Sequence, residues 1–358
     1  MIKKVCLLTD SLSNGGAEKM VSNLSISLFE KGYDITVVSM IDTIVYPYKG
    51  SLYNFGEIKS KNLLLSFLKF KRFFKTQQFD IILDHRVRSN FMKELIFSKT
   101  IFKNENVIYN IHHFNLKLYF PLVNVPWLSK FTFVRNREII AVSKEIQNEI
   151  REKFHLESVV IYNYALIDLL GINGDFDNSA SSNYIISVGR LTDVKQFNVL
   201  INSYKNSDLY KHDINLLILG EGSERANLEK LIKDLDLGAF VELIGFKSNA
   251  LAYIKKAKAL VLASKSEGFP MVLIEALSLK TPLVSYDCKS GPSEIIIHEE
   301  NGLLVDNQNT TKLTEALNKL LLDDAFYEKI TSNLSTYDNP FTEKKSIQKW
   351  VNLFERFN

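Results

Sequence analysis

The chain has 358 residues, of which 46% are hydrophobic and 24% are charged, and its formal net charge is +3. A chain of this length ordinarily forms two domains, and the composition excludes the disordered, fibrous and membrane-embedded classes. No stretch approaches the roughly 20 consecutive apolar residues of a membrane span. The only cysteines, Cys6 and Cys288, provide neither a disulfide framework nor metal-ligand spacing, which fits a reducing cytosol.

The charge is divided unevenly along the chain. Residues 1–165 carry 23 Lys and Arg against 15 Asp and Glu, whereas the remaining residues carry 21 against 26. This asymmetry predicts that only the first half meets a polyanionic surface. The N-terminal segment has a short apolar run that ends at Thr9, which indicates a first strand and no signal peptide. We therefore expect a cytoplasmic protein.

Short apolar segments alternate with helical segments through the first half, which is the pattern of a parallel sheet. The expected strands are residues 4–8, 35–39, 80–83, 106–110, 139–142 and 159–162. A loop with Asn14, Gly15 and Gly16 joins the first strand to a helix. Glycine here would let a ligand approach the backbone and the helix amides, and a plain tight turn is the alternative. The full dinucleotide fingerprint is absent, which argues against a nicotinamide dehydrogenase.

Residues 58–75 contain six Lys or Arg and no acidic residue. Leucines and phenylalanines recur there at three- and four-residue steps, which predicts a helix. One interpretation is a helix that lies on an anionic bilayer. The other is a crossover helix whose apolar side packs on the sheet while its lysines face solvent. Both interpretations are correct if the basic side of the helix faces lipid.

Basic residues follow two of the predicted strands in the first half. Arg86 and Arg88, with His85 before them, suit a phosphate or diphosphate, and a surface loop is the alternative. His112 and His113 end the next strand. A histidine at that edge can act as a general base or bind a sugar or phosphate, and a structural histidine is the alternative.

A polar segment at 169–183 is the predicted linker between the two halves. The predicted domains are therefore 1–168 and 184–340, followed by a C-terminal helix within 341–358. The second half restarts the alternation, with expected strands at residues 184–188, 214–219, 241–243, 259–263, 283–285 and 303–305.

Four charged residues follow strands of the second half. Arg190 and Lys195 follow its first strand, and Glu267 and Glu275 lie on the loop and helix after its fourth. The loops at the carboxyl ends of parallel strands converge on one edge of a sheet. Two cations for a diphosphate and two carboxylates for hydroxyl groups predict a nucleotide-sugar site there.

These motifs resemble those of the retaining family 4 glycosyltransferases of the GT-B fold. The match consists of G-R-L-x(3)-K, from Gly189 to Lys195, and E-x(7)-E, from Glu267 to Glu275. It extends to Gly15-Gly16, Gly220-Glu221-Gly222, Gly245-Phe246 and Gly291-Pro292. The resemblance implies an α/β protein with two Rossmann-like parallel-sheet domains facing each other across a cleft. It also implies that the C-terminal helix returns to the N-terminal domain.

The resemblance implies a role for each matching residue. Arg190 and Lys195 would stabilise the leaving diphosphate, Glu267 would hold the donor sugar, and Glu275 would bind the ribose. His112 would be the catalytic-site histidine, with His113 as its alternative. The other implied donor-binding residues are Gly16, Gly220, Gly245, Phe246, Gly268, Phe269, Met271 and Val272. The acceptor or phosphate candidates are Asn14, Gly15, Arg86, Arg88 and His113.

The expected reaction is retaining transfer of a hexose or N-acetylhexosamine from a nucleoside-diphosphate sugar, with UDP expected from the family. The expected acceptor is a lipid-diphosphate-linked saccharide for a bacterial surface glycan, used at the inner face of the cytoplasmic membrane. We expect no nucleic-acid partner, no cofactor beyond the sugar nucleotide and no metal, since the D-x-D at Asp234 to Asp236 ends a predicted helix. A GT-B sugar-nucleotide epimerase and a non-catalytic glycan-binding relative are the alternatives.

Overall fold

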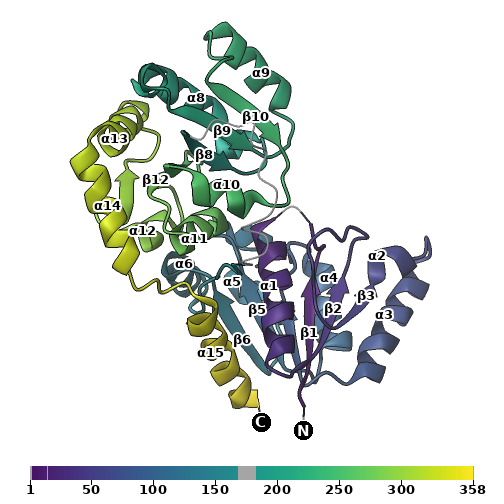
Figure 1. Ribbon diagram of the computed structural model, residues 1–358. Helices are drawn as coiled ribbons and strands as arrows, with labels where there is room; N and C mark the ends of the chain where they lie inside the picture. Colours follow the sequence, from purple (N-terminus) through teal and green to yellow (C-terminus); the bar gives the residue numbers. More distant parts are fainter. Residues whose placement is uncertain (1, 14, 168–182, 358) are drawn as a thin grey trace. The chain divides into compact units, whose positions relative to one another are not determined.

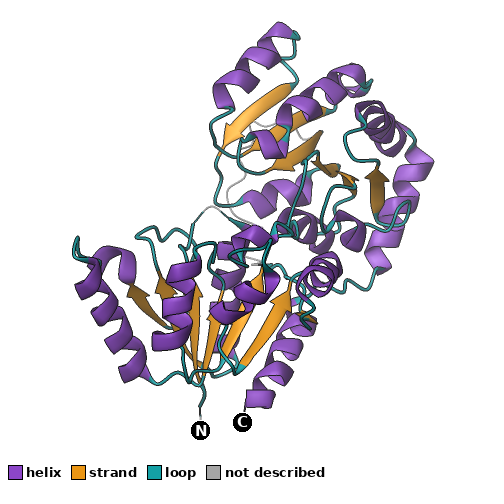
Figure 2. Cartoon of the chain, turned by 180° about the vertical axis from the view of Figure 1, so that it is seen from behind, coloured by secondary structure: helices purple, strands orange, loops and turns teal. Residues whose placement is uncertain are grey.

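The computed structural model describes residues 2–13, 15–167 and 183–357, and it divides the chain into two compact units (Figure 1). Unit 1 comprises Met1–Tyr164 and Glu343–Asn358, and unit 2 comprises Ala165–Thr342. Each unit is a parallel β-sheet covered by helices (Figure 2). The predicted linker at 169–183 lies outside the described residues, except for Asn183.

The sheet of unit 1 has seven parallel strands in the order β3-β2-β1-β4-β5-β6-β7. The strands are β1 Lys4–Thr9, β2 Asp34–Ser39, β3 Ser51–Asn54, β4 Ile81–Asp84, β5 Val107–Ile111, β6 Arg137–Ala141 and β7 Val159–Val160. The chain runs outward in one direction from β1 and in the other from β4. Ligands of open parallel sheets bind at such a reversal, outside the carboxyl ends of the strands.

The helices of unit 1 include one from the far end of the chain. They are α1 Gly16–Glu30, α2 Phe55–Ile58, α3 Leu63–Gln77, α4 Phe91–Ile96, α5 Pro126–Ser129, α6 Lys144–Phe154 and α15 Glu343–Phe354. Shorter helical turns are η1 Phe97–Ile101, η2 Leu116–Leu118, η3 Lys130–Thr132 and η6 Glu355–Phe357. The Lys3 ammonium donates to the Phe354 carbonyl (2.8 Å), and the Ser346 hydroxyl donates to the Tyr162 carbonyl (3.0 Å). The predicted return of the C-terminal helix to the N-terminal domain is confirmed.

The sheet of unit 2 has six parallel strands in the order β10-β9-β8-β11-β12-β13. The strands are β8 Tyr184–Val188, β9 Asn215–Leu219, β10 Val241–Gly245, β11 Ala259–Leu262, β12 Leu283–Tyr286 and β13 Gly302–Val305. The helices are α8 Phe197–Asn206, α9 Arg225–Asp234, α10 Ala250–Lys256, α11 Met271–Ser278, α12 Pro292–Ile295, α13 Thr310–Leu322 and α14 Asp324–Thr336, with the turns η4 Asp193–Lys195 and η5 Leu209–His212. Here the reversal lies between β8 and β11.

The central strands explain why the sequence pattern was informative. Every residue of β4 and of β11 is buried, because helices cover a parallel sheet on both of its faces. Such strands appear in a sequence as continuous apolar runs. The strand β3 was missed because it lies at the sheet edge, where its residues are only partly buried. The predicted GT-B-type pair of Rossmann-like domains is confirmed.

Candidate functional site

Two ion pairs join the loops that follow β8 and β11. The Lys195 ammonium lies 2.5 Å from the Glu267 carboxylate, and the Lys265 ammonium lies 2.6 Å from the Asp193 carboxylate. A backbone hydrogen bond of 2.8 Å between the same two loops lies beside them. The structure therefore brings together Lys195 and Glu267, which sequence analysis had placed in one site, at the reversal point of the unit 2 sheet.

The Lys195–Glu267 pair contributes geometry more than stability. The two side chains are 21% and 11% exposed, so water still screens the charges. Ion pairs with solvent access are worth about 1 kcal/mol or less. The contact does hold the ammonium group at the carboxyl edge of β8, where a diphosphate would meet a positioned cation.

Close backbone packing joins the loops that follow β8 and β9. A Cβ atom at Gly220, where φ is +141°, would lie 1.9 Å from the Gly189 carbonyl oxygen. The loop after β9 can therefore pass the loop after β8 only with glycine at that position. The Gly220 amide donates to the Gly245 carbonyl (2.9 Å), and the Phe246 side chain beyond it is exposed. The predicted base-side residues thus adjoin the predicted phosphate-side loop.

Helix α11 forms the next part of the candidate donor site. Pro270 precedes it as the N-cap residue, and Glu275 lies half-buried within it. The side chains of Phe269, Met271 and Val272 are buried. These three predicted donor-binding residues can therefore offer a ligand their backbone but not their side chains.

In unit 1, the loops after β4 and β5 bring two histidines together. His85 Nδ1 lies 2.8 Å from His112 Nε2, and both rings are more than nine-tenths buried. Burial lowers the pKa of His112 to about 4. Burial, with a smaller contribution from His112, lowers the pKa of His85 well below its ordinary value. Both rings are therefore neutral at pH 7. Of the two facing nitrogens, one carries a proton and donates a hydrogen bond to the lone pair of the other.

His85 was not among the predicted site residues as a histidine partner. The signal was present, because two predicted neighbouring strands each end in a histidine and parallel strands share their carboxyl edge. His113 faces its own loop instead. Its Nδ1 accepts a hydrogen bond from the Asn115 amide (3.0 Å), and its ring stacks on Phe114.

The lowered pKa of His112 predicts a loss of stability in acid. The unfolded chain binds the proton near pH 6.5, but the folded chain binds it only near pH 4, so stability falls as the pH drops between these values. The expected loss from His112 is about 3 kcal/mol in total, and His85 acts in the same direction. Hydrogen exchange of β4 and β5 amides at pH 7, 6, 5 and 4.5 measures this slope.

The variant His112→Asn should flatten the slope, because asparagine does not titrate. The exposed His155→Asn in the same unit is the control and should leave it unchanged. Equal slopes in the wild type and His112→Asn would contradict the prediction.

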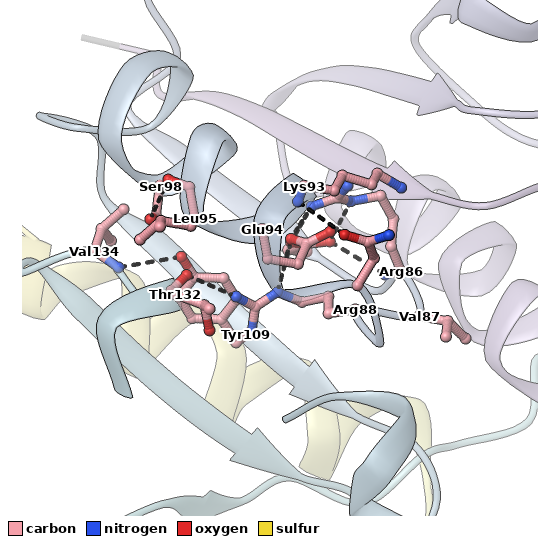
Figure 3. Close-up of polar contacts among 12 residues, drawn as sticks. Arg86, Val87, Arg88, Lys93, Glu94, Leu95, Ser98, Tyr109, Thr132 and Val134 are labelled. Atoms are coloured by element: carbon pink, nitrogen blue, oxygen red, sulfur yellow. Dashed lines mark hydrogen bonds and ion pairs between the residues drawn. The ribbon is translucent and has the colours of Figure 1, made fainter. Parts of the chain in front are cut away.

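The phosphate-binding interpretation of Arg86 and Arg88 was wrong (Figure 3). Both guanidinium groups are buried, as are the carboxylates of Asp84 and Glu94. Arg86 Nη2 lies 2.8 Å from Asp84 Oδ2 and 3.2 Å from Glu94 Oε2, and Arg88 Nε lies 3.2 Å from the same Glu94 oxygen. The alternative of a surface loop fits Val87, Ser89 and Asn90, which are exposed, but not the two arginines. Two buried cations compensate two buried anions.

Aromatic rings and backbone groups complete this buried ion cluster, defined as Asp84, Arg86, Arg88 and Glu94. The Arg88 guanidinium lies 4.1 Å from the Tyr109 ring centroid and 4.3 Å from that of Phe133, and it donates to the Thr132 carbonyl (2.9 Å). Burial alone would raise the pKa of Asp84, but Arg86 and Arg88 outweigh burial and lower it. The cluster fixes the loop on both sides of His85.

Breaking the cluster should destabilise unit 1 strongly. Glu94→Gln leaves two arginines facing one carboxylate in a buried site, and an uncompensated buried charge costs about 3–5 kcal/mol. Urea denaturation followed by hydrogen exchange in β4 measures the effect. The exposed Glu57→Gln is the matched control and should change stability by less than about 0.5 kcal/mol. A Glu94→Gln protein as stable as that control would contradict the prediction.

The glycine loop of unit 1 lies at the reversal point between β1 and β4. Gly15 precedes α1 as its N-cap residue, and Gly16 is the first residue of that helix. Asp10 accepts a hydrogen bond from the Val87 amide (2.7 Å), which ties this loop to the His85 loop. The candidate Asn14 lies outside the described residues.

Two protein-family models match the chain, one for each half. The model "Glycosyltransferase Family 4" matches residues 14–164, and "Glycosyl transferases group 1" matches residues 175–335. Together with two Rossmann-like units and the Arg190–Lys195 and Glu267–Glu275 motifs, these matches define a GT-B glycosyltransferase. The chain belongs to the family 4 glycosyltransferases.

Two curated relatives align over nearly their whole length. The amylovoran biosynthesis glycosyltransferase AmsD of Erwinia amylovora is 26% identical over 98% of this chain and 99% of its own. The Campylobacter jejuni N-acetylgalactosamine-N,N'-diacetylbacillosaminyl-diphospho-undecaprenol 4-alpha-N-acetylgalactosaminyltransferase is 29% identical over 96% of this chain and 97% of its own. Among solved structures, Anabaena HepE in complex with UDP has a TM-score of 0.76 at 18% identity, covering 99% of this chain and all of that one. That likeness supports the fold.

Among the described residues, no group of three or more His, Cys, Asp and Glu side chains could hold a metal ion. The D-x-D segment lies at the end of α9, which finishes at Asp234. Metal independence stays a prediction. Within the same residues, no helix has both the length and the apolar content needed to cross a bilayer.

Proposed function

We propose that this glycosyltransferase transfers a hexose or N-acetylhexosamine, with retention, from a UDP-sugar to a lipid-diphosphate-linked saccharide in surface glycan synthesis. The observation that carries the proposal is the Lys195–Glu267 contact at the reversal point of unit 2. It joins a cation suited to a diphosphate to a carboxylate suited to sugar hydroxyls. Arg190 follows the same strand as Lys195, so two cations face the two phosphates.

Unit 2 is the proposed donor-binding unit. The diphosphate binds Arg190 and Lys195, while the ribose hydroxyls donate to Glu275 on α11. Backbone amides at Gly268 and beyond, with the Glu267 carboxylate, hold the sugar. Because Glu267 already contacts Lys195, one carboxylate sets both the position of the cation and that of the sugar.

The proposed chemistry follows from charge development on the leaving group. The bond between the anomeric carbon and the phosphate oxygen breaks, and the acceptor oxygen forms the new bond on the same face. The acceptor proton passes to the leaving phosphate oxygen, so no enzymic nucleophile is required. Positioned cations stabilise the negative charge that grows on the diphosphate, the kind of preorganised stabilisation that usually dominates catalysis.

The relatives support the proposed substrates. The Campylobacter protein is named for a diphospho-undecaprenol acceptor, the Erwinia protein for amylovoran biosynthesis, and Anabaena HepE has UDP bound. A lipid-linked acceptor also explains the positive charge of residues 1–165, because such an acceptor lies among anionic headgroups.

The donor proposal predicts that UDP stabilises the protein and that the site residues are essential. UDP at 100 times its dissociation constant should stabilise unit 2 by about 2.7 kcal/mol, seen as a thermal shift. Arg190→Ala and Lys195→Ala should lose most of that shift and reduce transfer at least about 100-fold, as expected for lost transition-state contacts. Glu267→Gln should lose transfer but keep UDP binding, because glutamine no longer orients the sugar and Lys195.

The controls are the exposed Lys230→Ala and NAD in place of UDP. Stabilisation by NAD and by no nucleoside diphosphate would refute the donor class. Product analysis distinguishes the alternatives, since an epimerase would convert the UDP-sugar without an acceptor and a glycan-binding relative would leave it intact.

The membrane side of the proposal rests on helix α3. Phe70 and Phe74 are buried against aromatic rings of unit 1, among them Phe55 and Phe102, and the helix connects β3 to β4, so the crossover interpretation holds. The first turns of the helix nevertheless expose four leucines, Leu63, Leu64, Leu65 and Leu68, at 73%, 66%, 52% and 49%. Exposed cations surround them at Lys59, Lys61, Lys69, Lys71, Arg72 and Lys75. We define these ten residues as the leucine–lysine surface.

The topology gives this surface a direction. Because α3 connects the parallel strands β3 and β4, it runs opposite to them and begins at the carboxyl edge of the sheet (Figure 1). The exposed leucines therefore lie at the same edge as His85 and His112. Leucines inserted in the bilayer and lysines on the headgroups would hold this edge against the membrane, where a lipid-linked saccharide is found.

Neutralising the surface should release the protein from anionic vesicles. Each cation near such a membrane contributes about 1 kcal/mol, so Gln at Lys69, Lys71, Arg72 and Lys75 together should weaken binding roughly a thousandfold at low salt. Sedimentation with vesicles of phosphatidylglycerol and phosphatidylcholine measures the binding. The matched control places Gln at four exposed lysines of unit 2, namely Lys211, Lys230, Lys233 and Lys255.

Serine at Leu63, Leu64, Leu65 and Leu68 should weaken binding even with all cations present. It should also weaken binding to neutral vesicles, which separates insertion from charge attraction. If the unit 2 control loses as much binding as the α3 variant, only overall charge matters and the surface has no special role.

A further inference from the structure

The two buried histidines of unit 1 each keep one ring nitrogen without a partner. Within the part of the chain that the structure describes, His85 Nε2 and His112 Nδ1 make no hydrogen bond. Buried polar atoms are nearly always hydrogen-bonded, and exceptions often mark a site that completes its bonds with a ligand. Other such atoms include Arg86 Nη1, Arg88 Nη1 and Glu94 Oε1 of the buried ion cluster, but these two ring nitrogens belong to one hydrogen-bonded pair, in which the other two ring nitrogens bind each other.

The pair lies where an open parallel sheet binds ligands. His85 follows β4, the strand at the reversal point, and His112 follows β5, the next strand in the sheet. Both residues are thus at the carboxyl edge. Neither ring belongs to the buried ion cluster, which compensates its own charges, so the pair is not part of that structural network.

We propose that His85 is a positioning residue for His112, fixing the plane of the His112 ring and setting which of its nitrogens carries the proton. This inference rests on the proposed function and on the expectation from the sequence that His112 is the catalytic-site histidine, where it meets a substrate hydroxyl. His85 holds His112 at Nε2, so only Nδ1 of His112 can meet that hydroxyl.

The pair determines the character of that nitrogen. If His85 Nδ1 donates to His112 Nε2, the proton of His112 lies on Nδ1 and Nδ1 is a donor. If His112 Nε2 donates instead, Nδ1 is an acceptor. A sugar hydroxyl whose other hydrogen bonds are already fixed needs either a donor or an acceptor at Nδ1, so the state of the pair decides whether it complements the substrate. His85 therefore determines whether His112 Nδ1 donates a hydrogen bond to the substrate or accepts one from it.

Three contacts keep His85 from turning away. Its own amide donates to the Leu8 carbonyl (2.8 Å), which continues the β1–β4 pairing. Asp84 before it and Arg86 after it are locked in the buried ion cluster. The next amide, that of Val87, donates to Asp10. The backbone of the loop is thus restrained on both sides of the histidine, and the ring has a defined direction.

Two amide variants separate a positioning role from a general packing role. In His85→Asn, the polar atoms lie one bond beyond Cγ, where Nδ1 was, so the contact to His112 is kept. In His85→Gln, they lie one bond further out, where Nε2 was, so that contact is lost. We expect His85→Asn to keep kcat within about fivefold of the wild type, and His85→Gln to lower kcat at least twentyfold. The KM for the UDP-sugar should change less than threefold in both, since Arg190 and Lys195 are untouched.

Long-range ¹⁵N–¹H spectra of histidine-labelled protein report the tautomer of His112 directly. The wild type and His85→Asn should each show His112 in one dominant tautomer, whereas His85→Gln should show a mixture or the opposite form. The exposed His155→Asn is the control for both assays and should match the wild type.

Equal kcat values in the Asn and Gln variants, or an unchanged His112 spectrum in His85→Gln, would overturn the inference. If the wild type is active and His112→Ala is inactive, either of these two results overturns only the role of His85 and leaves the proposed function intact. A wild type inactive with every UDP-sugar would defeat the proposed function instead, and the spectra would still decide whether His85 sets the tautomer of His112.

Discussion

The contact between Lys195 and Glu267 depends on one topological constraint, which is that β8 and β11 are neighbours although they are far apart in sequence. A parallel sheet that grows outward from two adjacent central strands leaves their following loops facing each other at the carboxyl edge. One loop supplies cations and the other supplies a carboxylate. Glycine at Gly220 then lets a third loop pack against the first, where a Cβ would collide with the Gly189 carbonyl. The candidate donor site of unit 2 is thus a consequence of strand order.

Unit 1 has the same kind of strand order, but the charged groups at its reversal point are arranged differently. At its reversal point the charges are buried and compensated, and each of two neutral imidazoles keeps one nitrogen without a partner. Arg86 and Arg88 are required to balance Asp84 and Glu94, since removing one charge from a buried cluster leaves another uncompensated. Their structural role is to hold the loop that carries His85. A rigid loop beneath a neutral histidine pair suits recognition of hydroxyl groups, whereas the partly exposed cations of unit 2 suit a diphosphate.

Prediction from the sequence was most successful where local pattern and tertiary environment agree. The apolar runs of β4 and β11 predicted buried parallel strands, and the motif spacing predicted that the loops of Lys195 and Glu267 meet. It was wrong for Arg86 and Arg88, because a basic run after a strand looks the same whether it faces solvent or two buried carboxylates. Glu94 carried no signal of its own, since it lies in the following helix. For α3, the sequence left two interpretations open, and the structure shows that buried phenylalanines and exposed leucines occupy different parts of one helix.

The sequence by itself determined the fold class, the position of the candidate donor site and the family, because these follow from periodicity, glycine placement and motif spacing along the chain. Only the tertiary structure decided which charged side chains are buried, which nitrogen of His112 is occupied and which face of α3 remains exposed. The physical reason is that burial and pairing are set by residues distant in the sequence. Glu94 and Phe133 pack against the arginines, β5 brings His112 to His85, and aromatic rings such as Phe97 and Phe102 cover Phe70 and Phe74 while the leucines stay exposed.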